Sequence, residues 1–180
     1  MTPRRIAVIG TSGAGKTTLA AGISERLGIA HVELDALHWL ENWTPNPTFR
    51  ETVAAALSEP TWVVDGNYSR VSELTLGQAD TAVWLDYRLP RLLWRTHNRI
   101  WRRALMREVL YNGNRERLWE HLFTRESLYW WVLTTYRSRR RRFAALETRF
   151  PHLQVVRLRT PVETAVWLKS LPHEVTAVNR

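Results

Sequence analysis

The sequence predicts an α/β fold, with a parallel five-stranded sheet covered by helices on both faces. Short apolar, β-branched runs alternate with segments of helical periodicity, which is the pattern of repeated strand–helix–strand units. The first apolar run leads directly into a glycine-rich loop of the type that binds phosphate. A length of 180 residues, 44% of them hydrophobic, fits one domain with an ordinary core, spanning residues 1–180.

The expected elements follow one another along the chain. A first helix begins at Lys16, carries Leu19, Ile23 and Leu27 at a spacing of four, and ends at Gly28. The later helices are expected at 47–57 and 162–171, the last with Thr160 as its N-cap. The expected strands are residues 4–10, 29–35, 61–66, 81–86 and 153–158.

Residues 88–150 form a long helical insertion between the fourth and fifth expected strands. Asn112 and Gly113 interrupt its helical pattern, and a second long helix is expected over 126–150. On a helical wheel, one sector of the helix that opens this insertion is basic and comprises Arg88, Arg91, Arg95, Arg99 and Arg102. The opposite side is expected to pack inward and comprises Leu89, Leu93, Ile100, Trp101 and Ala104.

The positive charge is concentrated in this insertion. Residues 88–142 hold 15 arginines, no lysine and four acids, so their net charge of +11 exceeds the +9 of the whole chain. Arginine makes planar, bidentate contacts with phosphate or carboxylate, which lysine does not. The segment is therefore expected to bind an anion, either a compact phosphate group or a nucleic-acid backbone.

The glycine-rich loop, GTSGAGKT at residues 10–17, fits the pattern G-x-x-x-x-G-K-[ST] and is followed by Thr18. Its glycines let successive backbone N–H groups point at phosphate oxygens, and the following helix adds the positive end of its dipole. Lys16 is expected to reach the β- and γ-phosphates of ATP, and the Thr17 hydroxyl to bind Mg²⁺. The expected ATP-binding residues of the loop are Gly10, Ser12, Gly13, Ala14, Gly15, Lys16, Thr17 and Thr18.

Asp65 closes the apolar run Trp62-Val63-Val64. A carboxylate at a strand end beside the phosphate loop is what a hydrated Mg²⁺ requires, so Asp65 is a second expected metal residue. The alternative is that Asp65 caps the following turn.

Four motifs in order resemble one known family. GTSGAGKTT, HVELDALHW with NWTP close behind, WVVDGNYSR and DTAVWLDYRLPR are similar to motifs of the FlaR-like "DNA topology modulation protein" group, small P-loop proteins often labelled adenylate-kinase-like. The resemblance is close over residues 4–103. It implies a three-layer P-loop NTPase fold with strand order 2-3-1-4-5, and an ATP- and Mg²⁺-dependent kinase whose insertion at about 88–150 is a lid. Because the group's name implies DNA and its motifs imply phosphoryl transfer, a nucleic-acid-binding regulator that uses ATP as a switch is the alternative.

The resemblance also implies an acceptor site after the second strand, for a nucleotide, nucleoside or hydroxyl compound. Asp35 is placed there, where its carboxylate favours a hydroxyl, or a base or sugar edge, over a phosphate because like charges repel. The alternative is that Asp35 caps the following turn. Lid arginines, Arg99 and Arg103 among them, are expected to spread the charge of the transferring phosphoryl group. The other expected acceptor contacts are His38, Trp39, Asn67, Tyr68 and Arg70, and Arg159 is expected near the adenine.

The run Arg137–Arg142 exceeds what a phosphate lid needs. Because it covers much of a helix circumference, it is expected to serve nucleic acid or solubility rather than one pocket. The chain has no cysteine, no run of about 18 apolar residues and no signal-peptide pattern, so a cytoplasmic protein without a membrane span is expected. The sequence does not indicate an oligomeric state.

Overall fold

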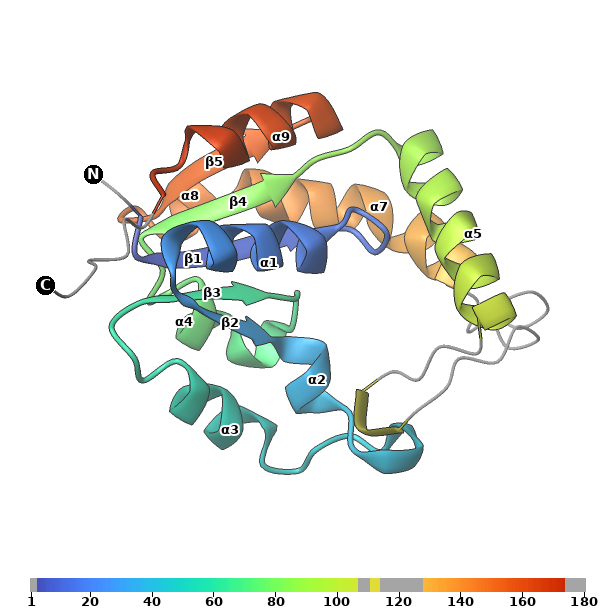
Figure 1. Cartoon of the computed structure of the whole chain (residues 1–180), viewed down its shortest axis with the longest axis horizontal. Helices are drawn as coiled ribbons and strands as arrows, with labels where there is room; N and C mark the ends of the chain where they lie inside the picture. The colour runs from blue at the N-terminus through green and yellow to red at the C-terminus, as the bar shows by residue number, and fades with distance from the viewer. Residues whose placement is uncertain (1–2, 107–110, 114–127, 174–180) are drawn as a thin grey trace, which may run out of the picture.

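The computed structural model describes residues 3–106, 111–113 and 128–173 (Figure 1). Its strands are all parallel and form one sheet in the order β2-β3-β1-β4-β5. Their bounds are Arg5–Gly10 for β1, Ala30–Glu33 for β2, Trp62–Asp65 for β3, Thr81–Leu85 for β4 and Gln154–Leu158 for β5. This confirms the predicted α/β class and the strand order that the family resemblance implied.

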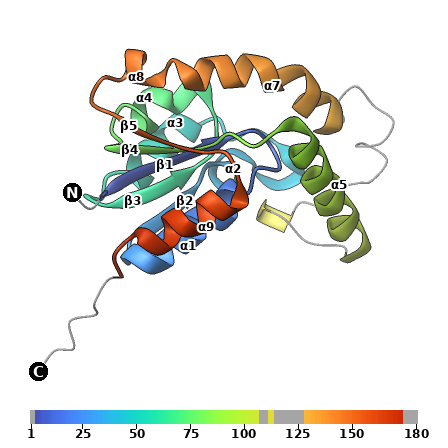
Figure 2. The same cartoon turned by 90° about the horizontal axis from the view of Figure 1, so that it is seen from above.

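Helices cover both faces of the sheet (Figure 2). One face carries α1 (Lys16–Leu27) and α9 (Pro161–Ser170). The other carries α3 (Phe49–Ala56), α4 (Ser72–Thr75), α7 (Leu128–Ala144) and α8 (Leu146–Arg149). Helix α5 (Leu89–Met106) lies across the carboxyl ends of the strands (Figure 1). Four short elements complete the described part: α2 (Leu34–His38) and the 3₁₀ turns η1 (Glu41–Trp43), η2 (Ser69–Val71) and η3 (Tyr111–Gly113).

The sheet divides the core into two layers because successive strand residues point to opposite faces. Ile6 and Val8 of β1 pack toward α1 and α9, whereas Ala7 and Ile9 pack toward α3, α4, α7 and α8. All four are at most 3% exposed. The near-continuous apolar runs of the sequence therefore correspond to strands that are buried on both faces.

The helix ends agree with the sequence signals. Gly28 ends α1 in the left-handed conformation, with φ of 64°, and its N–H donates to Ser24 O. Thr160 caps α9, because its hydroxyl accepts a hydrogen bond from the Glu163 N–H at 3.1 Å. Within the described residues, no helix is long and apolar enough to span a membrane.

The second strand is shorter than predicted. β2 ends at Glu33, so Asp35 lies in α2 instead of closing a strand. The ladder ends with the pair Glu33↔Asp65, where β3 stops and Gly66 turns away with φ of 132°. Beyond that point the edge strand has no partner for its backbone groups, and the chain closes a helical turn in which Trp39 N donates to Asp35 O.

The buried side of α5 agrees with the helical-wheel prediction at Leu89, Leu93 and Ile100, which pack against the core, and differs at Trp101. The Ala104 side chain lies outside the described part of the structure. The deeply buried positions are Leu92, Thr96 and Ile100, at a spacing of four, and none is more than 2% exposed. Trp101, which was expected to pack inward, is 41% exposed, and Trp94 is 65% exposed. Leu92 and Thr96 face the phosphate loop, so contact with that loop decides which side of α5 is buried.

Candidate functional site

The phosphate loop has the conformation that its glycines predict. Gly13 and Gly15 adopt φ of 79° and 91°, a region that other residues rarely enter. They also lie against α5: a Cβ on Gly13 would come within 2.4 Å of Thr96 Oγ1, and one on Gly15 within 2.6 Å of Arg95 Nη2. Both positions therefore need glycine for their backbone geometry, and Gly13 also needs it for the close approach of α5.

Asn67 holds the beginning of this loop. Its Nδ2 donates to the Gly10 carbonyl at 2.5 Å, and its Oδ1 accepts from the Gly10 N–H at 3.4 Å. The side-chain amide thus joins the segment after β3 to the first residue of the phosphate loop. Sequence reasoning assigned Asn67 to the acceptor. The structure places it on the wall of the pocket described below, with both ends of its amide engaged by Gly10.

Lys16 is partly buried at the amino end of α1. Burial lowers the pKa of its ammonium group, and the carboxylates of Asp35 and Asp65 oppose that shift. Asp65 is 3% exposed, and among the described residues its buried Oδ2 has no hydrogen-bond partner, with His31 Nε2 at 3.7 Å. A buried carboxylate oxygen without a donor, beside a phosphate loop, fits a divalent cation.

Glu33 is a site residue that sequence reasoning missed. Its Oε1 accepts a hydrogen bond from Thr17 Oγ1 at 3.2 Å, and its backbone is paired in register with Asp65. Two neighbouring strands therefore end in carboxylates beside the hydroxyl that is expected to bind Mg²⁺. The available signal was the spacing Glu33-Leu34-Asp35, two acids at the end of an apolar strand. Within the described residues no cluster of three His, Cys, Asp or Glu could hold a metal alone, so a Mg²⁺ here would also need phosphate and water oxygens.

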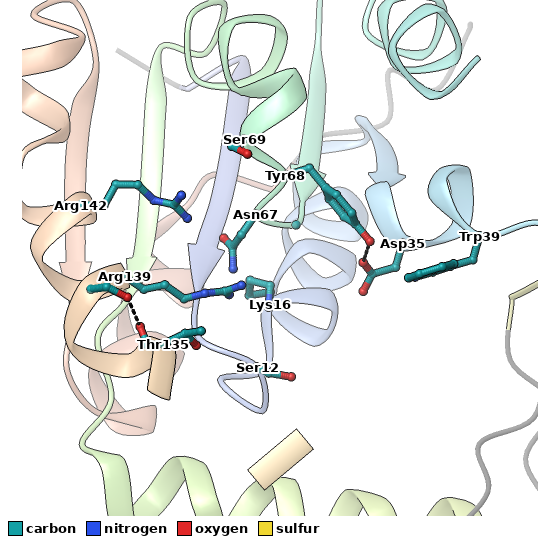
Figure 3. Close-up of a pocket in the computed structure, with 12 residues that line it drawn as sticks. Ser12, Lys16, Asp35, Trp39, Asn67, Tyr68, Ser69, Thr135, Arg139 and Arg142 are labelled. Carbon is teal, nitrogen blue, oxygen red and sulfur yellow. Dashed lines mark hydrogen bonds between the residues drawn. The ribbon is translucent and has the colours of Figure 1, made fainter. Parts of the chain in front are cut away.

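A cavity of about 720 Å³ opens between the phosphate loop, α2, the segment after β3, and α7 (Figure 3). We call it the acceptor pocket, after the acceptor site that the sequence predicts. On one side, the Tyr68 hydroxyl donates to Asp35 Oδ1 at 2.6 Å. On the other, Arg139 extends from α7 toward Lys16 (Figure 3). The lining residues are Ser12, Lys16, Asp35, Trp39, Gly66, Asn67, Tyr68, Ser69, Thr135, Ser138, Arg139 and Arg142.

The arginine run at the end of α7 differs from its prediction. Arg139 and Arg142 line the acceptor pocket, and burial together with the charge of Arg142 lowers the pKa of the Arg139 guanidinium. Arg140 instead pairs with the buried Asp86, with Arg140 Nε 2.9 Å from Asp86 Oδ1, and Asp86 also accepts from Arg157. The run does span the helix circumference, but its members contact a pocket on one side and an ion-pair cluster on the other.

The lid arginines reach the loop from α5. Arg99 Nη2 donates to Ser12 Oγ at 3.3 Å, and the Arg95 guanidinium lies against Gly15. Arg99 therefore lies close enough to the loop for its expected role beside the phosphates. The side chain of Arg103 lies outside the described part of the structure, so its expected role stays a prediction.

Of the other residues expected to contact the acceptor, Trp39 lines the pocket, whereas His38 and Arg70 do not. Trp39 lines the pocket, with its ring 5.7 Å from that of Trp43 in an edge-to-face arrangement. His38 packs edge-on against Phe49, with ring centroids 4.8 Å apart, and burial lowers its pKa. Arg70 is exposed and is absent from the pocket lining.

Arg159 lines a second cavity, of about 630 Å³, at the carboxyl ends of β4 and β5. Its other lining residues are Asp86, Arg88, Arg91, Arg140, Thr160 and Glu163. This position, where the starts of α5 and α9 meet, is where sequence reasoning expected the adenine.

Comparisons with known proteins agree with this architecture. No family model matches the chain. Protein YqaC of Bacillus subtilis (strain 168), itself uncharacterised, is 30% identical over 104 residues, which are 53% of this chain and 58% of that protein. The match thus spans less than two thirds of the relative's length.

Solved kinase structures share the fold. Shikimate kinase from Bacteroides thetaiotaomicron superposes with a TM-score of 0.58 and 14% identity, over 94% of this chain and 96% of that one. Deoxyadenosine kinase from M. mycoides gives 0.52 and 18%, over 93% and 98%. A gluconokinase from Sinorhizobium meliloti 1021 gives 0.51 and 20%, over 94% of each chain. The chain therefore has the fold of P-loop small-molecule kinases, along almost the full length of these three enzymes.

Proposed function

We propose that this protein transfers the γ-phosphoryl group of ATP to a small acceptor that binds in the acceptor pocket. One observation carries the proposal: a single cavity joins Lys16 and Ser12 of the phosphate loop to Asp35 on one side and Arg139 on the other. Phosphoryl transfer needs a donor phosphate, an acceptor and stabilising cations within reach of one another. The likeness to small-molecule kinases supports the fold that this arrangement requires.

On the donor side, the backbone N–H groups of the phosphate loop and the amino end of α1 would bind the ATP phosphates, with Lys16 at the β- and γ-phosphates. The adenine would lie toward Arg159. Thr17, Asp65 and Glu33 would hold Mg²⁺. A bound Mg²⁺ neutralises phosphate charge and fixes the orientation of the leaving group.

On the acceptor side, Asp35 would receive a hydrogen bond from the reacting hydroxyl, orient it and accept its proton. The hydrogen bond from Tyr68 fixes the direction of that carboxylate. Lys16, Arg99 and Arg139 would then spread the negative charge that the transferred group carries. This division of roles favours a hydroxyl acceptor over the phosphate of a nucleoside monophosphate, because a phosphate needs no base and is repelled by Asp35.

Membership of the FlaR-like group and a cytoplasmic location belong to the same proposal. The motifs LDALHW and VVDGNYS support the membership. Asp35 and Trp39 of the first motif and Asn67 and Tyr68 of the second line the same pocket.

The proposal is tested by measuring ADP formation from Mg·ATP with a panel of hydroxyl compounds, nucleosides and nucleoside monophosphates, and with duplex DNA. One class of small acceptor should accelerate ADP formation. Lys16→Ala should reduce that rate by at least about 10³-fold, because it removes a contact to the transferring phosphoryl group. Stimulation by duplex DNA alone, with a steep decline at higher salt, would instead identify a nucleic-acid-dependent ATPase.

A further inference from the structure

A third, smaller cavity, which we call the ring cavity, adjoins the acceptor pocket on the sheet face that α4, α7 and α8 cover. Its volume is about 150 Å³. Gly66, Asn67, Tyr68, Ser69 and Arg142 line both cavities, so the two lie next to each other. Its deeper wall is apolar and is formed by Ala7, Ile9, Val64, Leu76, Phe143, Leu146 and Phe150.

One lining residue of this cavity, Arg149, belongs to an exposed ion pair. Arg149 of α8 donates to Glu73 Oε1 of α4 at 2.7 Å, and the Arg149 guanidinium lies over the Phe150 ring. Because the two cavities adjoin at these shared residues, the ring cavity lies next to the proposed phosphoryl-transfer site.

The volume of the ring cavity indicates the size of the ligand group that would fit it. Protein interiors contain few voids larger than a water molecule, and an apolar cavity of about 150 Å³ stays dry and holds one benzene-sized ring. Such a space between a sheet and its covering helices forgoes packing energy unless a ligand fills it.

Four polar side chains on its wall already have hydrogen-bond partners within the protein. Thr75 Oγ1 donates to Val71 O at 3.2 Å, and Ser72 Oγ donates to Ser69 O at 3.0 Å. The Asn67 amide is bound to Gly10, and the Tyr68 hydroxyl to Asp35. A nucleobase has several edge donors and acceptors, and burying them here without partners would cost free energy.

We infer that the acceptor is a hydroxyl compound with a compact apolar ring, and that the ring enters the ring cavity while the hydroxyl stays beside Asp35. Arg142, which lines the junction of the two cavities, and Arg139 favour an acidic substituent between ring and hydroxyl. The inference rests on the proposed function for the role of the hydroxyl. The ring site itself can be tested without any turnover.

The test uses 3-phenyllactate and lactate, two hydroxy acids that differ only by a phenyl ring. Isothermal titration of the full chain without nucleotide should give a dissociation constant for phenyllactate roughly 10- to 100-fold lower than that for lactate. Ala7→Leu should remove this difference, because Ala7 lines the ring cavity but not the acceptor pocket. Val64→Ile, which adds a single methylene group, should reduce it.

Two controls keep the result interpretable. Ala54→Leu makes the same change at an exposed position of α3 and should preserve the preference for phenyllactate. Ala7→Leu should melt at or above the wild-type temperature, because the larger side chain fills a void; if it does not fold, Val64→Ile decides the matter.

Equal affinity for phenyllactate and lactate would overturn the inference, as would a preference that survives Ala7→Leu. Uridine binding that Ala7→Leu abolishes would also overturn it, by placing a nucleobase in the cavity. A separate titration with a non-hydrolysable ATP analogue distinguishes the two proposals. If the analogue does not bind the wild type, the proposed kinase function fails, whereas the ring preference stands or falls on its own measurement.

Discussion

The hydroxyl of Tyr68 donates a 2.6 Å hydrogen bond to Asp35 Oδ1, and this contact joins two segments that are distant in the sequence. Tyr68 follows β3, in the same segment as Asn67, which holds the phosphate loop at Gly10. Asp35 belongs to α2, after β2. The carboxylate proposed to orient the acceptor is therefore positioned by the same segment that fixes the donor loop.

Tyr68→Phe should lower kcat/KM for the acceptor by about 10- to 100-fold, because a hydrogen bond to a charged group contributes roughly 1.5–3 kcal/mol. Binding of an ATP analogue should stay unchanged. Tyr129→Phe removes a tyrosine hydroxyl that bonds His97 outside the pocket and serves as the matched control. Steady-state kinetics with varied acceptor would check this; equal losses in both variants would refute a specific role for Tyr68.

Arg139→Ala should reduce kcat by about 10²- to 10³-fold, the usual effect of removing a cation aimed at developing charge. Arg137→Ala is the matched control, because Arg137 lies two residues earlier on α7, is exposed and does not line the pocket. Its kcat should stay within about twofold of the wild type. If both variants lose activity equally and the losses vanish at high salt, the helix acts through its overall charge instead.

Glu33→Gln should raise the Mg²⁺ concentration needed for half-maximal activity by about tenfold, because the variant keeps a hydrogen-bond acceptor for Thr17 but loses the charge. Glu25→Gln, an exposed change on α1, should leave the Mg²⁺ dependence as it is. Titrating activity against Mg²⁺ at fixed ATP gives the answer. An unshifted titration would remove Glu33 from the metal site.

The free energy of unfolding should depend strongly on Asp86. Its side chain is 3% exposed and pairs with both Arg140 and Arg157, whose side chains are 49% and 34% exposed. Asp86→Ala should destabilise the fold by about 2–3 kcal/mol, below the usual cost of breaking a buried pair because both arginines can return to water. The exposed pair of Glu73 and Arg149 gives the control: Glu73→Gln should cost less than about 1 kcal/mol in the same urea titration.

The lowered pKa of His38 predicts how the free energy of unfolding changes at acidic pH. Burial lowers its folded-state pKa below the ordinary value of about 6.5, so the unfolded chain binds the proton more readily. Its contribution is full above pH 6.5 and is lost as the pH falls below that value toward the folded pKa. His38→Phe keeps the ring contact with Phe49 and should flatten the decline in unfolding free energy between pH 7 and 5. His152→Gln, at an exposed position, should leave that slope unchanged.

The fold was predictable because its signals are local. The β-branched runs, the glycine loop, the Gly28 stop and the Thr160 cap each act within a few residues, and the structure confirms all of them. The length of β2 was not predictable in this way. It depends on where β3 ends, since an edge strand continues only as far as its partner.

The site was predictable where a motif carries it. Lys16, Asp35 and Trp39 come from separate motifs and line one pocket, while their roles toward donor and acceptor stay predictions. The roles of Arg139 and Arg140 could not be read from the sequence, because they depend on how α7 crosses the sheet. Arg139 and Arg140 are neighbours on α7, yet the first lines the pocket and the second pairs with the buried Asp86.

The central claim is phosphoryl transfer from ATP to a molecule held in the acceptor pocket. The most direct measurement uses ATP labelled at the γ-phosphate and follows the label in each candidate acceptor, together with the ADP formed. If the protein is such a kinase, one labelled acceptor molecule should form for every ADP, with the label lost in Lys16→Ala and strongly reduced in Arg139→Ala. Label that appears only as inorganic phosphate, at a rate no small acceptor changes, would contradict it.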